Sequence, residues 1–599
     1  MIGLLLVVWL AWVIGSAVVG KTGHIDGPPT GLLGLVTGEN EWPWSAWIAL
    51  ILLVAALATG GWKLWQHGPW TSTSDTVIKE KTSVLASAKE TSGITLADAR
   101  RSTQRLWPDA DLDDEDQCGM RVGMMMDRRN PVVIPWEWVA TVLAGPRSGK
   151  TLAFAIPQVL RAPGACVATS NKPDLWAATA LARSDHGTAW LSDLQRISTR
   201  PGQDWWWNPL RGVDSQAGAL RVASYFVSAS REDNQRTDAY FDGGAQALLA
   251  LMMLAAAVSG GDLWHVYGWL AEPERELPSE LLITAGEPMA AERLRTARAL
   301  NPRQRDGLYD MARRFISVLE EPVYACSVLP PERHSYGDSD STIGRVPRPK
   351  PCVGPEFIAD EFVLSTDTLY ALSMEGPDAA TPLTTALIGT VFDSAVKCAR
   401  SYGGRLPTPM VAVLDEAANV CKLKDLPSWY SHFGSQGICV WTFIQSLPQA
   451  IDVWGETGTD KLISASNLHI YAGGALDLGR STYLADLSRM IGVHDVARWN
   501  KSVNEGSSLF SHHGAQQSWS TESVFTADEL AALNSTLAIA ITSGNSPILL
   551  RKEWVTDEDH PLHETVQRSK ADVRLDRLVP SPAQREVLAT ATPERKALS

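Results

Sequence analysis

Short apolar runs alternate with longer amphipathic segments along most of the chain. Runs of about four to eight residues rich in β-branched side chains are typical of buried strands, and apolar residues spaced three or four apart are typical of helices. The runs that predict strands are 139–143, 165–169, 188–191, 367–373, 409–414 and 438–444. Two pairs of runs, 120–126 with 132–134 and 536–542 with 547–551, predict hairpins, the second at a sheet edge. This alternation predicts an α/β fold with a parallel sheet.

The amino end differs from the rest, because it carries two long uncharged runs. Ile2 to Val19 and Trp44 to Trp62 each hold about 18 residues, which at 1.5 Å per residue come close to the thickness of a bilayer core. We expect two transmembrane helices. Acidic residues prevail between the runs and lysines follow the second, so both termini are expected in the cytoplasm. A cleaved signal peptide is the alternative for the first run, although a basic start is missing.

Composition sets limits on the function. The chain has 599 residues and a net charge of −14, which argues against a protein that coats nucleic acid, so any DNA contact should be local. Its seven cysteines are scattered and form no C-x-x-C pair, so neither a disulfide framework nor a zinc ribbon is expected.

The stretch from Trp138 to Leu160 predicts a phosphate-binding loop. An apolar run is followed by GPRSGKT and then by a helix-forming segment, which is the order of strand, loop and helix that such a loop needs. Small residues let successive amide N–H groups turn towards phosphate oxygens, and the helix start favours the same anions. The nucleotide-binding residues predicted here are Gly145, Pro146, Arg147, Ser148, Gly149, Lys150 and Thr151. Ala144 replaces the first glycine of the usual pattern, which loosens the match slightly.

Hydrolysis needs a metal ligand and an activated water, and the run from Val411 to Glu416 offers both. A buried strand that ends in two acids can deliver Asp415 to Mg²⁺, together with the Thr151 hydroxyl, and Glu416 to the attacking water. Gln445, at the end of the run 438–444, stands where a sensor of the γ-phosphate would stand. The predicted catalytic residues are therefore Glu416, Lys150 and Gln445.

Other polar clusters are weaker candidates. Lys172 and Asp174 follow the predicted strand 165–169, where ligands bind in open parallel sheets, and ordinary turn chemistry explains them equally well. Asn208 fits a structural turn better than a binding site.

The combination of these motifs resembles the type IV coupling proteins of conjugation, the TraG/TraD-like family. The resemblance rests on the two amino-terminal runs, GPRSGKT, the turn at Asn208, LDEAANV (414–420) and GICVWTFIQS (437–446). It implies a RecA-like P-loop motor domain with an all-α insertion, a homohexamer, and ATP-driven delivery of relaxase-bound single-stranded DNA to a type IV secretion channel. ATP and Mg²⁺ are the implied cofactors, and the inner (cytoplasmic) membrane is the implied location. An arginine finger is implied too, and Arg480 is a candidate for it.

The predicted domains follow from changes in composition along the chain. Charged, Ala/Leu/Arg-rich segments with helical spacing fill the middle of the chain, between Gly/Pro-rich loops. We expect a membrane anchor (1–66), a linker that is partly helical (67–118), the first part of the ATPase domain (119–258), the all-α insertion (259–352), the second part of the ATPase domain (353–560) and a flexible tail (561–599).

Two other functions compete with DNA transfer in conjugation. A pump for double-stranded DNA would share the motor, but normally carries a further DNA-reading domain after it. A nucleotide-gated docking receptor for protein substrates would need little hydrolysis, which Asp415-Glu416 argues against. ATP turnover with and without single-stranded DNA separates these possibilities.

Overall fold

The computed structural model describes residues 2–20, 28–37, 40–54, 85, 90–126, 129–198, 203–230, 239–336, 342–343, 346–352, 354–376, 379–475, 482–502 and 514–571. They belong to two compact units, Met1–Ser83 and Val84–Ser599. The second unit, called the body below, carries every predicted site residue.

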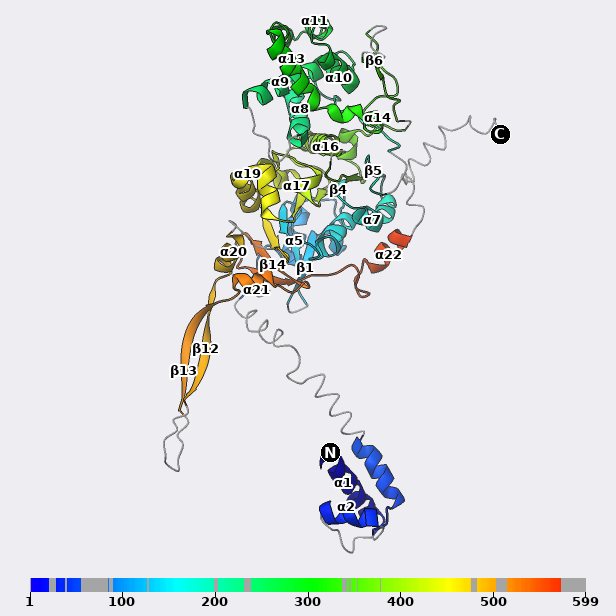
Figure 1. Ribbon diagram of the computed structural model, residues 1–599, viewed down its shortest axis with the longest axis vertical. Helices are drawn as coiled ribbons and strands as arrows, with labels where there is room; N and C mark the ends of the chain where they lie inside the picture. Colours follow the sequence, from blue (N-terminus) through cyan, green and yellow to red (C-terminus); the bar gives the residue numbers. More distant parts are fainter. Residues whose placement is uncertain are drawn as a thin grey trace, which may run out of the picture. The chain divides into compact units, whose positions relative to one another are not determined.

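An eleven-stranded sheet forms the centre of the body (Figure 1). Seven neighbouring strands run parallel, in the order β11-β3-β10-β9-β4-β8-β5, and β14, β15, β1 and β2 continue the sheet with antiparallel pairings. The parallel strands are β11 (Leu468–Tyr471), β3 (Ala140–Leu143), β10 (Ile438–Ile444), β9 (Met410–Leu414), β4 (Cys166–Ser170), β8 (Thr368–Leu372) and β5 (Ala189–Ser192). The others are β14 (Leu537–Thr542), β15 (Ile548–Arg551), β1 (Met120–Met125) and β2 (Pro131–Ile134). The predicted parallel α/β sheet is confirmed.

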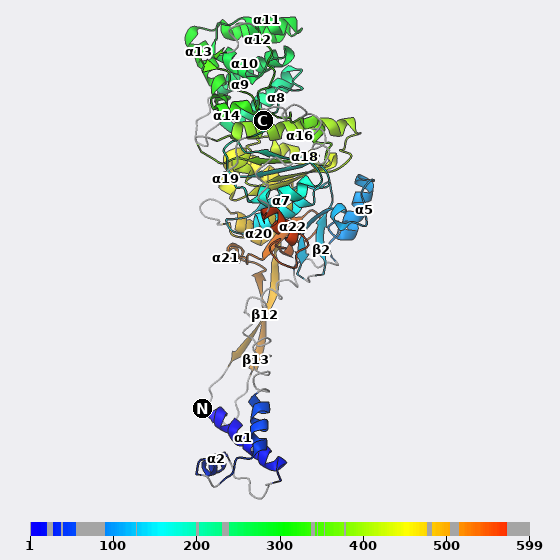
Figure 2. The ribbon, with the colours of Figure 1, turned by 90° about the vertical axis from the view of Figure 1, so that its right-hand side faces the viewer.

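Helices cover both faces of this sheet. Figure 2 shows α16 and α18 on one side, with α19, and α7 and α22 on the other. The bounds are α6 (Ile156–Leu160), α7 (Asp174–Ser184), α15 (Ala359–Phe362), α16 (Thr381–Ser401), α17 (Ala417–Val420), α18 (Leu426–Phe433), α19 (Leu447–Ser464), α20 (Tyr483–Ile491), α21 (Ala527–Ala531) and α22 (His563–Ala571). Every residue of β10 is buried, because both faces of this central strand are covered.

A group of helices lies at one end of the body (Figure 1). It contains α8 (Gln216–Ser230), α9 (Ala239–Val258), α10 (Leu263–Ala271), α11 (Leu277–Thr284), α12 (Pro288–Arg298), α13 (Pro302–Arg314) and α14 (Pro322–Cys326). The long apolar helix α9 packs against α8, α10, α11, α12 and α13, and α8 also contacts α16. The assignment of residues 259–352 as a separate domain stays a prediction, and α9 joins the helices that follow it.

Three expectations from the sequence are corrected in the body. The hairpin β14–β15 lies inside the sheet, because β1 pairs with β15 and β2 forms the edge. The helix expected in the linker, α5 (Leu96–Leu106), does not lie in a free linker but packs on the body, since it contacts β2 and Ile94 before it is fully buried. The predicted tail includes α22, which packs on α7 through the buried Val566, so the start of the tail at residue 561 is wrong.

The sequence pattern also missed some strands. The four-residue β11 was not predicted, nor were β12 (Val493–Ser502) and β13 (Gly514–Ser523), which form a polar two-stranded ribbon that projects from the body (Figure 1). A small pair, β6 (Thr342–Ile343) and β7 (Val346–Pro347), follows α14.

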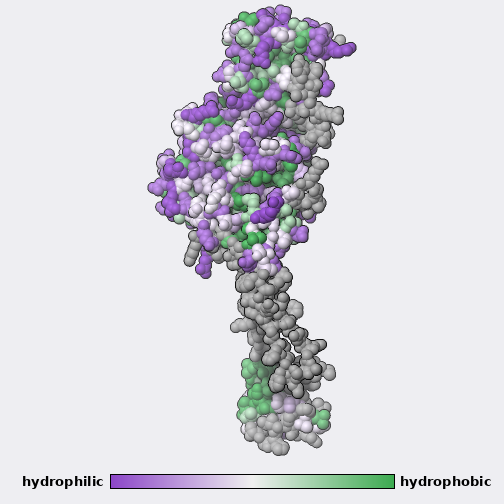
Figure 3. Space-filling view, turned by 90° about the vertical axis from the view of Figure 1, so that its left-hand side faces the viewer, coloured by the Kyte–Doolittle hydropathy of each residue, from purple (hydrophilic) through white to green (hydrophobic). Residues whose placement is uncertain are grey.

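The amino-terminal unit is a small helical assembly. It contains α1 (Ile2–Val18), α2 (Pro28–Thr37) and a helix over residues 44–54. Gly15 allows the close approach of the first and last of these, because an added Cβ there would lie 2.4 Å from the Ala46 Cα. Ser45 donates a hydrogen bond of 2.6 Å to the Gly15 carbonyl. Large apolar side chains are exposed on this unit (Figure 3), among them Ile14, Val18, Leu33, Trp44, Trp47, Ile51 and Leu52.

The prediction of two membrane-spanning helices is not confirmed. Within the part of the chain that the structure describes, no helix combines the length and the apolar character needed to cross a membrane. α1 has 17 residues, and the described part of the second run ends at residue 54, so residues 55–62 lie outside the described ranges.

Candidate nucleotide site

The predicted phosphate loop connects β3 to a short helix. Residues 144–149 form the loop, and the chain continues through a π-helical turn, Thr151–Ala155, into α6. The Gly145 N–H donates to the Gly473 carbonyl at 3.0 Å, and an added Cβ at Gly145 would lie 1.9 Å from the Gly474 oxygen. Only glycine fits this close approach of two backbones.

The loop is bent in the way that a cradle of amides requires. Gly149 has a φ of 81° and Arg147 a φ of 59°, both in the left-handed region. Ala144 has no positive φ, and its N–H donates to the Ile444 carbonyl at 3.0 Å. Position 144 therefore does not use the backbone conformations that only glycine adopts easily, and alanine fits there as well.

Asp415 and Glu416 follow β9, two strands away from the loop, with β10 between them. The Thr151 hydroxyl donates to Asp415 Oδ2 at 3.3 Å, and Lys150 Nζ lies 3.2 Å from Asp415 Oδ1. Lys150 Nζ also donates to Glu416 Oε1 in a very short contact. The parallel register brings together the four residues that the sequence predicted for phosphate, metal and water, because all of these strands end at one edge.

The backbone at Glu416 is strained. Its φ of 55° and ψ of 44° place a non-glycine residue in the left-handed region, which costs of order 1–3 kcal/mol. The start of α17 holds this conformation, since the N–H groups of Asn419 and Val420 donate to the Glu416 carbonyl at 2.8 and 2.9 Å. The strain directs the carboxylate of Glu416 back towards Lys150.

Burial controls the electrostatics of the site. Asp415 is 4% exposed and Glu416 7%. Burial raises the pKa of Asp415, the Lys150 ammonium lowers it, and the neighbouring Glu416 carboxylate raises it again. Two buried carboxylates face one ammonium, so the negative charge at this edge is not fully balanced and favours a further cation.

The donor set fits a nucleotide phosphate and Mg²⁺. Ser148 Oγ is buried with no hydrogen-bond partner among the described residues, and the same is true of Asp415 Oδ1 apart from its ion pair with Lys150. The described residues contain no cluster of three His, Cys, Asp or Glu side chains that would hold a metal ion. A site with one hydroxyl and one carboxylate suits Mg²⁺, which takes further ligands from water and phosphate oxygens.

Gln445 lies at the same edge of the sheet. It follows Ile444, which pairs with Leu143, so it stands level with the start of the phosphate loop. This position agrees with a sensor of the bound phosphate, although its role stays a prediction.

The weaker candidates differ in their surroundings. Lys172 is exposed, and its N–H donates to Ser170 Oγ at 3.2 Å, while Asp174 starts α7. Asn208 accepts a hydrogen bond of 2.9 Å from the Leu210 N–H, which is the turn expected from the sequence. The arginine-finger candidate Arg480 lies outside the described residues.

Two residues beside the loop had no signal in the sequence. Lys552 Nζ donates to the Ser148 carbonyl at 2.8 Å, and the ring of Trp554 lies against Gly149, where an added Cβ would be 2.3 Å from the Cη2 atom. Both follow β15, about 400 residues after the loop, and no motif marks them.

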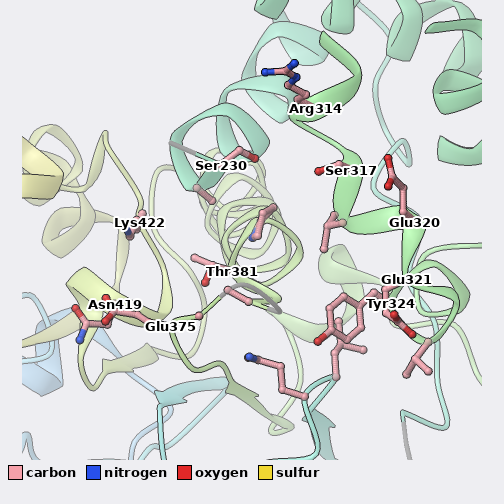
Figure 4. A pocket seen from close by; sticks show the side chains of 18 of the residues that line it. Ser230, Arg314, Ser317, Glu320, Glu321, Tyr324, Glu375, Thr381, Asn419 and Lys422 are labelled. Atoms are coloured by element: carbon pink, nitrogen blue, oxygen red, sulfur yellow. The ribbon is translucent and has the colours of Figure 1, made fainter. Parts of the chain in front are cut away.

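A large cavity of about 1150 Å³ lies between the helical group and the sheet (Figure 4). Arg314, Glu320 and Tyr324 line it on the helical side, and Asn419 and Lys422, which follow Glu416, line it on the other. It therefore lies next to the segment that follows β9, but the predicted nucleotide residues do not line it.

A phosphate loop after β3 and an acidic pair after β9, on a mixed sheet with a large parallel part, define a nucleotide-binding P-loop fold. Two family models match the chain: "Type IV secretory system Conjugative DNA transfer" over residues 97–267, and "TraM recognition site of TraD and TraG" over residues 409–535. The first match contains Lys150 and the second contains Asp415 and Glu416. The resemblance predicted from the sequence is thereby confirmed, because two separate regions of the chain match family models of type IV coupling proteins.

Solved structures of a coupling protein are also similar. The bacterial conjugative coupling protein TrwB, in an unbound form lacking its amino-terminal part, is 16% identical, with 69% of this chain and 85% of that chain covered and a TM-score of 0.46. TrwB with a non-hydrolysable GTP analogue is 15% identical, with 70% and 88% covered and a TM-score of 0.47. TrwB with ADP and Mg²⁺ is 16% identical, with 71% and 88% covered and a TM-score of 0.45. No curated protein matches the chain. The likeness to type IV coupling proteins rests on the two family models.

Proposed function

We propose that the protein is a membrane-anchored ATPase that couples relaxase-bound single-stranded DNA to a type IV secretion channel and drives DNA transfer in conjugation. The observation that carries this proposal is the convergence of Lys150, Thr151, Asp415 and Glu416 at one edge of the sheet. The two family matches supply the context of conjugative transfer.

The N–H groups of the loop residues Arg147 and Gly149 and the Lys150 ammonium would hold the phosphates of ATP, and Thr151 and Asp415 would hold Mg²⁺. When bound, Mg²⁺ supplies positive charge that neutralises the developing charge on the phosphates. Gln445 would contact the terminal phosphate from the end of β10.

Glu416 takes the proton of the attacking water. In the structure its carboxylate is paired with Lys150, so the ammonium occupies a carboxylate oxygen that the attacking water would need. Phosphate oxygens compete for the same ammonium. Nucleotide binding therefore draws Lys150 away and frees Glu416, so that the base is released only when its substrate is present.

The chain acts as a homohexamer on this proposal, with an arginine finger from a neighbouring subunit. Its partners are the relaxase–DNA complex and the components of the secretion channel. The match to a TraM recognition model over residues 409–535 supports a docking role for the second half of the motor. The exposed apolar side chains of the amino-terminal unit support anchoring to the inner membrane, because large exposed apolar patches mark membrane or protein contacts.

Donor cells that lack the chain provide the test. Wild-type protein supplied in trans should restore DNA transfer, and Glu416→Gln should not. Because a hexamer mixes subunits, co-expression of Glu416→Gln with the wild type should lower transfer further than co-expression of Lys172→Ala. Restoration of transfer by Glu416→Gln alone would overturn the proposal.

A further inference from the structure

Lys552 is a buried cation directly behind the phosphate loop. It is 3% exposed, and its Nζ donates to the Ser148 carbonyl at 2.8 Å and to the Ala472 carbonyl at 2.6 Å. Among the residues that the structure describes, it forms no ion pair with a carboxylate within 4.0 Å. A buried ammonium without a countercharge is costly, so its retention calls for a reason other than stability.

The segment that carries Lys552 follows the loop closely. The Lys552 N–H donates to the Thr536 carbonyl at 2.8 Å, which fixes the segment beside the start of β14. Trp554 lies against Gly149, and the Val555 N–H donates to the Leu152 carbonyl at 3.4 Å. Residues 552–555 therefore support the loop and the first turn of its helix from behind.

The contact of Lys552 with the loop affects how the peptide groups of the loop are oriented. In a phosphate loop the amide N–H groups turn towards the anion, so the carbonyl groups face away from it. Lys552 binds one of these outward carbonyls, that of Ser148. Its charge then adds to the positive potential of the loop, as a helix dipole does.

We propose that Lys552 is a positioning residue for the nucleotide: its ammonium holds the Ser148 carbonyl so that the loop amides face the phosphates, and the bound phosphates supply the countercharge that Lys552 lacks. This inference rests on the proposed nucleotide site. It assigns a second cation to the site besides Lys150, one that acts through the loop and does not touch the phosphates.

Burial lowers the pKa of Lys552 to about 8. Lys150 is engaged with Asp415 and Glu416, and Glu553 with Arg121. The charged and titratable groups on the segments around Lys552 are Arg147 and Lys150 on the loop, His469 and Tyr471 on β11, Arg551 and Glu553 on its own segment, and His560 and His563 before and in α22; the Tyr471 hydroxyl donates to the Leu530 carbonyl. None of them makes an ion pair with Lys552 in the described part of the chain.

A pH dependence follows from this environment. A bound phosphate raises the pKa of Lys552, so the ammonium persists in the complex at pH values where the free protein has lost it. Above about pH 8, nucleotide affinity should fall, by up to about tenfold per pH unit, because binding then requires uptake of a proton. Below that pH the contribution of Lys552 is constant.

The experiment is a calorimetric titration of the full chain with Mg²⁺ and the non-hydrolysable analogue ADPNP, from about pH 7 to 9. Lys552→Met removes the charge and keeps the stem, Lys552→Arg keeps the charge at every pH, and Lys570→Met, on the exposed face of α22, is the matched control. We expect Lys552→Met to weaken binding at least about tenfold at pH 7 and to lose the fall above pH 8. Lys552→Arg should bind well and also lose that fall, and Lys570→Met should behave as the wild type.

Titrations in two buffers of different ionisation heat give a second readout, since only the wild type and Lys570→Met should take up a proton at pH 8. A folded Lys552→Met with wild-type affinity and pH profile would overturn the inference. If Lys552→Met does not fold, a wild-type fall in affinity above pH 8 in Lys552→Arg would overturn it equally. If the wild type itself binds no ADPNP, the proposed nucleotide site is wrong as well.

Discussion

Lys150 and Glu416 form a buried ion pair between residues 266 positions apart, with side chains only 13% and 8% exposed. The same ammonium lies beside Asp415, so one lysine is paired with two carboxylates and only partly offsets their charge. This arrangement changes what the loss of Lys150 should do. The side chain is expected to serve nucleotide binding and also to offset the charge of the acidic pair.

Lys150→Ala should therefore abolish ATP hydrolysis and also lower stability. Removing one partner of a buried ion pair costs about 3–5 kcal/mol at most, and protonation of one carboxylate reduces this loss. The measurements are ATP turnover and thermal unfolding without nucleotide. Lys172→Ala, at the exposed turn after β4, is the control and should change neither. ATP turnover that survives in Lys150→Ala would refute the assignment of the phosphate loop.

Exchanging the two acids one at a time should separate binding from turnover. Glu416→Gln keeps the size of the side chain but removes the base, so turnover should fall by roughly 10² to 10⁴ while Mg²⁺-dependent ATP binding persists. Asp415→Asn should weaken that binding itself, because its carboxylate belongs to the metal site. Affinity and turnover measured on each variant decide the matter. The opposite pattern would mean that the two roles are reversed.

The loop glycines should differ sharply from Ala144. Gly145→Ala places a Cβ 1.9 Å from a backbone oxygen, which cannot move aside as a side chain can, so it should cost about 1–3 kcal/mol or more and impair ATP binding. Ala144→Gly should leave binding unchanged, because Ala144 does not use a positive φ. Nucleotide titration and chemical unfolding test this pair. Equal affinities for the two variants would contradict the geometry of the loop.

The position of an amino-terminal truncation should matter more than the domain limits from the sequence suggest. A chain that starts at residue 84 keeps Ile94, Ala99 and Trp107, which are buried in the body. A chain that starts at residue 119 loses them, at about 1.5–3 kcal/mol for each large apolar side chain. Thermal unfolding should therefore show the shorter chain to be markedly less stable. Identical midpoints would mean that residues 90–118 are a linker after all.

The longer of these truncated chains should also show whether activity depends on assembly into the proposed homohexamer. Without the first 83 residues, subunits lose whatever concentration the membrane gives them, so ATP turnover per subunit should rise with protein concentration. A specific activity that does not change on dilution would contradict an active site completed by a neighbour.

Much of this architecture was predictable, because the relevant signals are local. The strand β10 has the predicted bounds, since its apolar run fixes them, and the site residues Lys150 and Asp415 stand in motifs. Lys552 and Trp554 could not be predicted in the same way. Their contacts to the loop depend on how β15 enters the sheet between β1 and β14, and nothing in the local sequence marks that pairing.

The errors have similar causes. β14 and β15 look like an edge hairpin because the strand that covers them, β1, lies more than 400 residues earlier in the chain. The folded α5 and α22 are rich in charge, and each buries only a few side chains, such as Ala99 and Val566, which composition alone does not distinguish from a linker or a tail.

ATP turnover of the full chain, measured with and without single-stranded DNA, tests the central claim most directly. We predict that single-stranded DNA raises the rate several-fold in the wild type, and that Glu416→Gln lowers the stimulated rate by about 10² or more. Stimulation by double-stranded DNA alone would favour a duplex pump. Negligible turnover under every condition, with ATP still bound, would contradict the motor and leave a nucleotide-gated docking receptor.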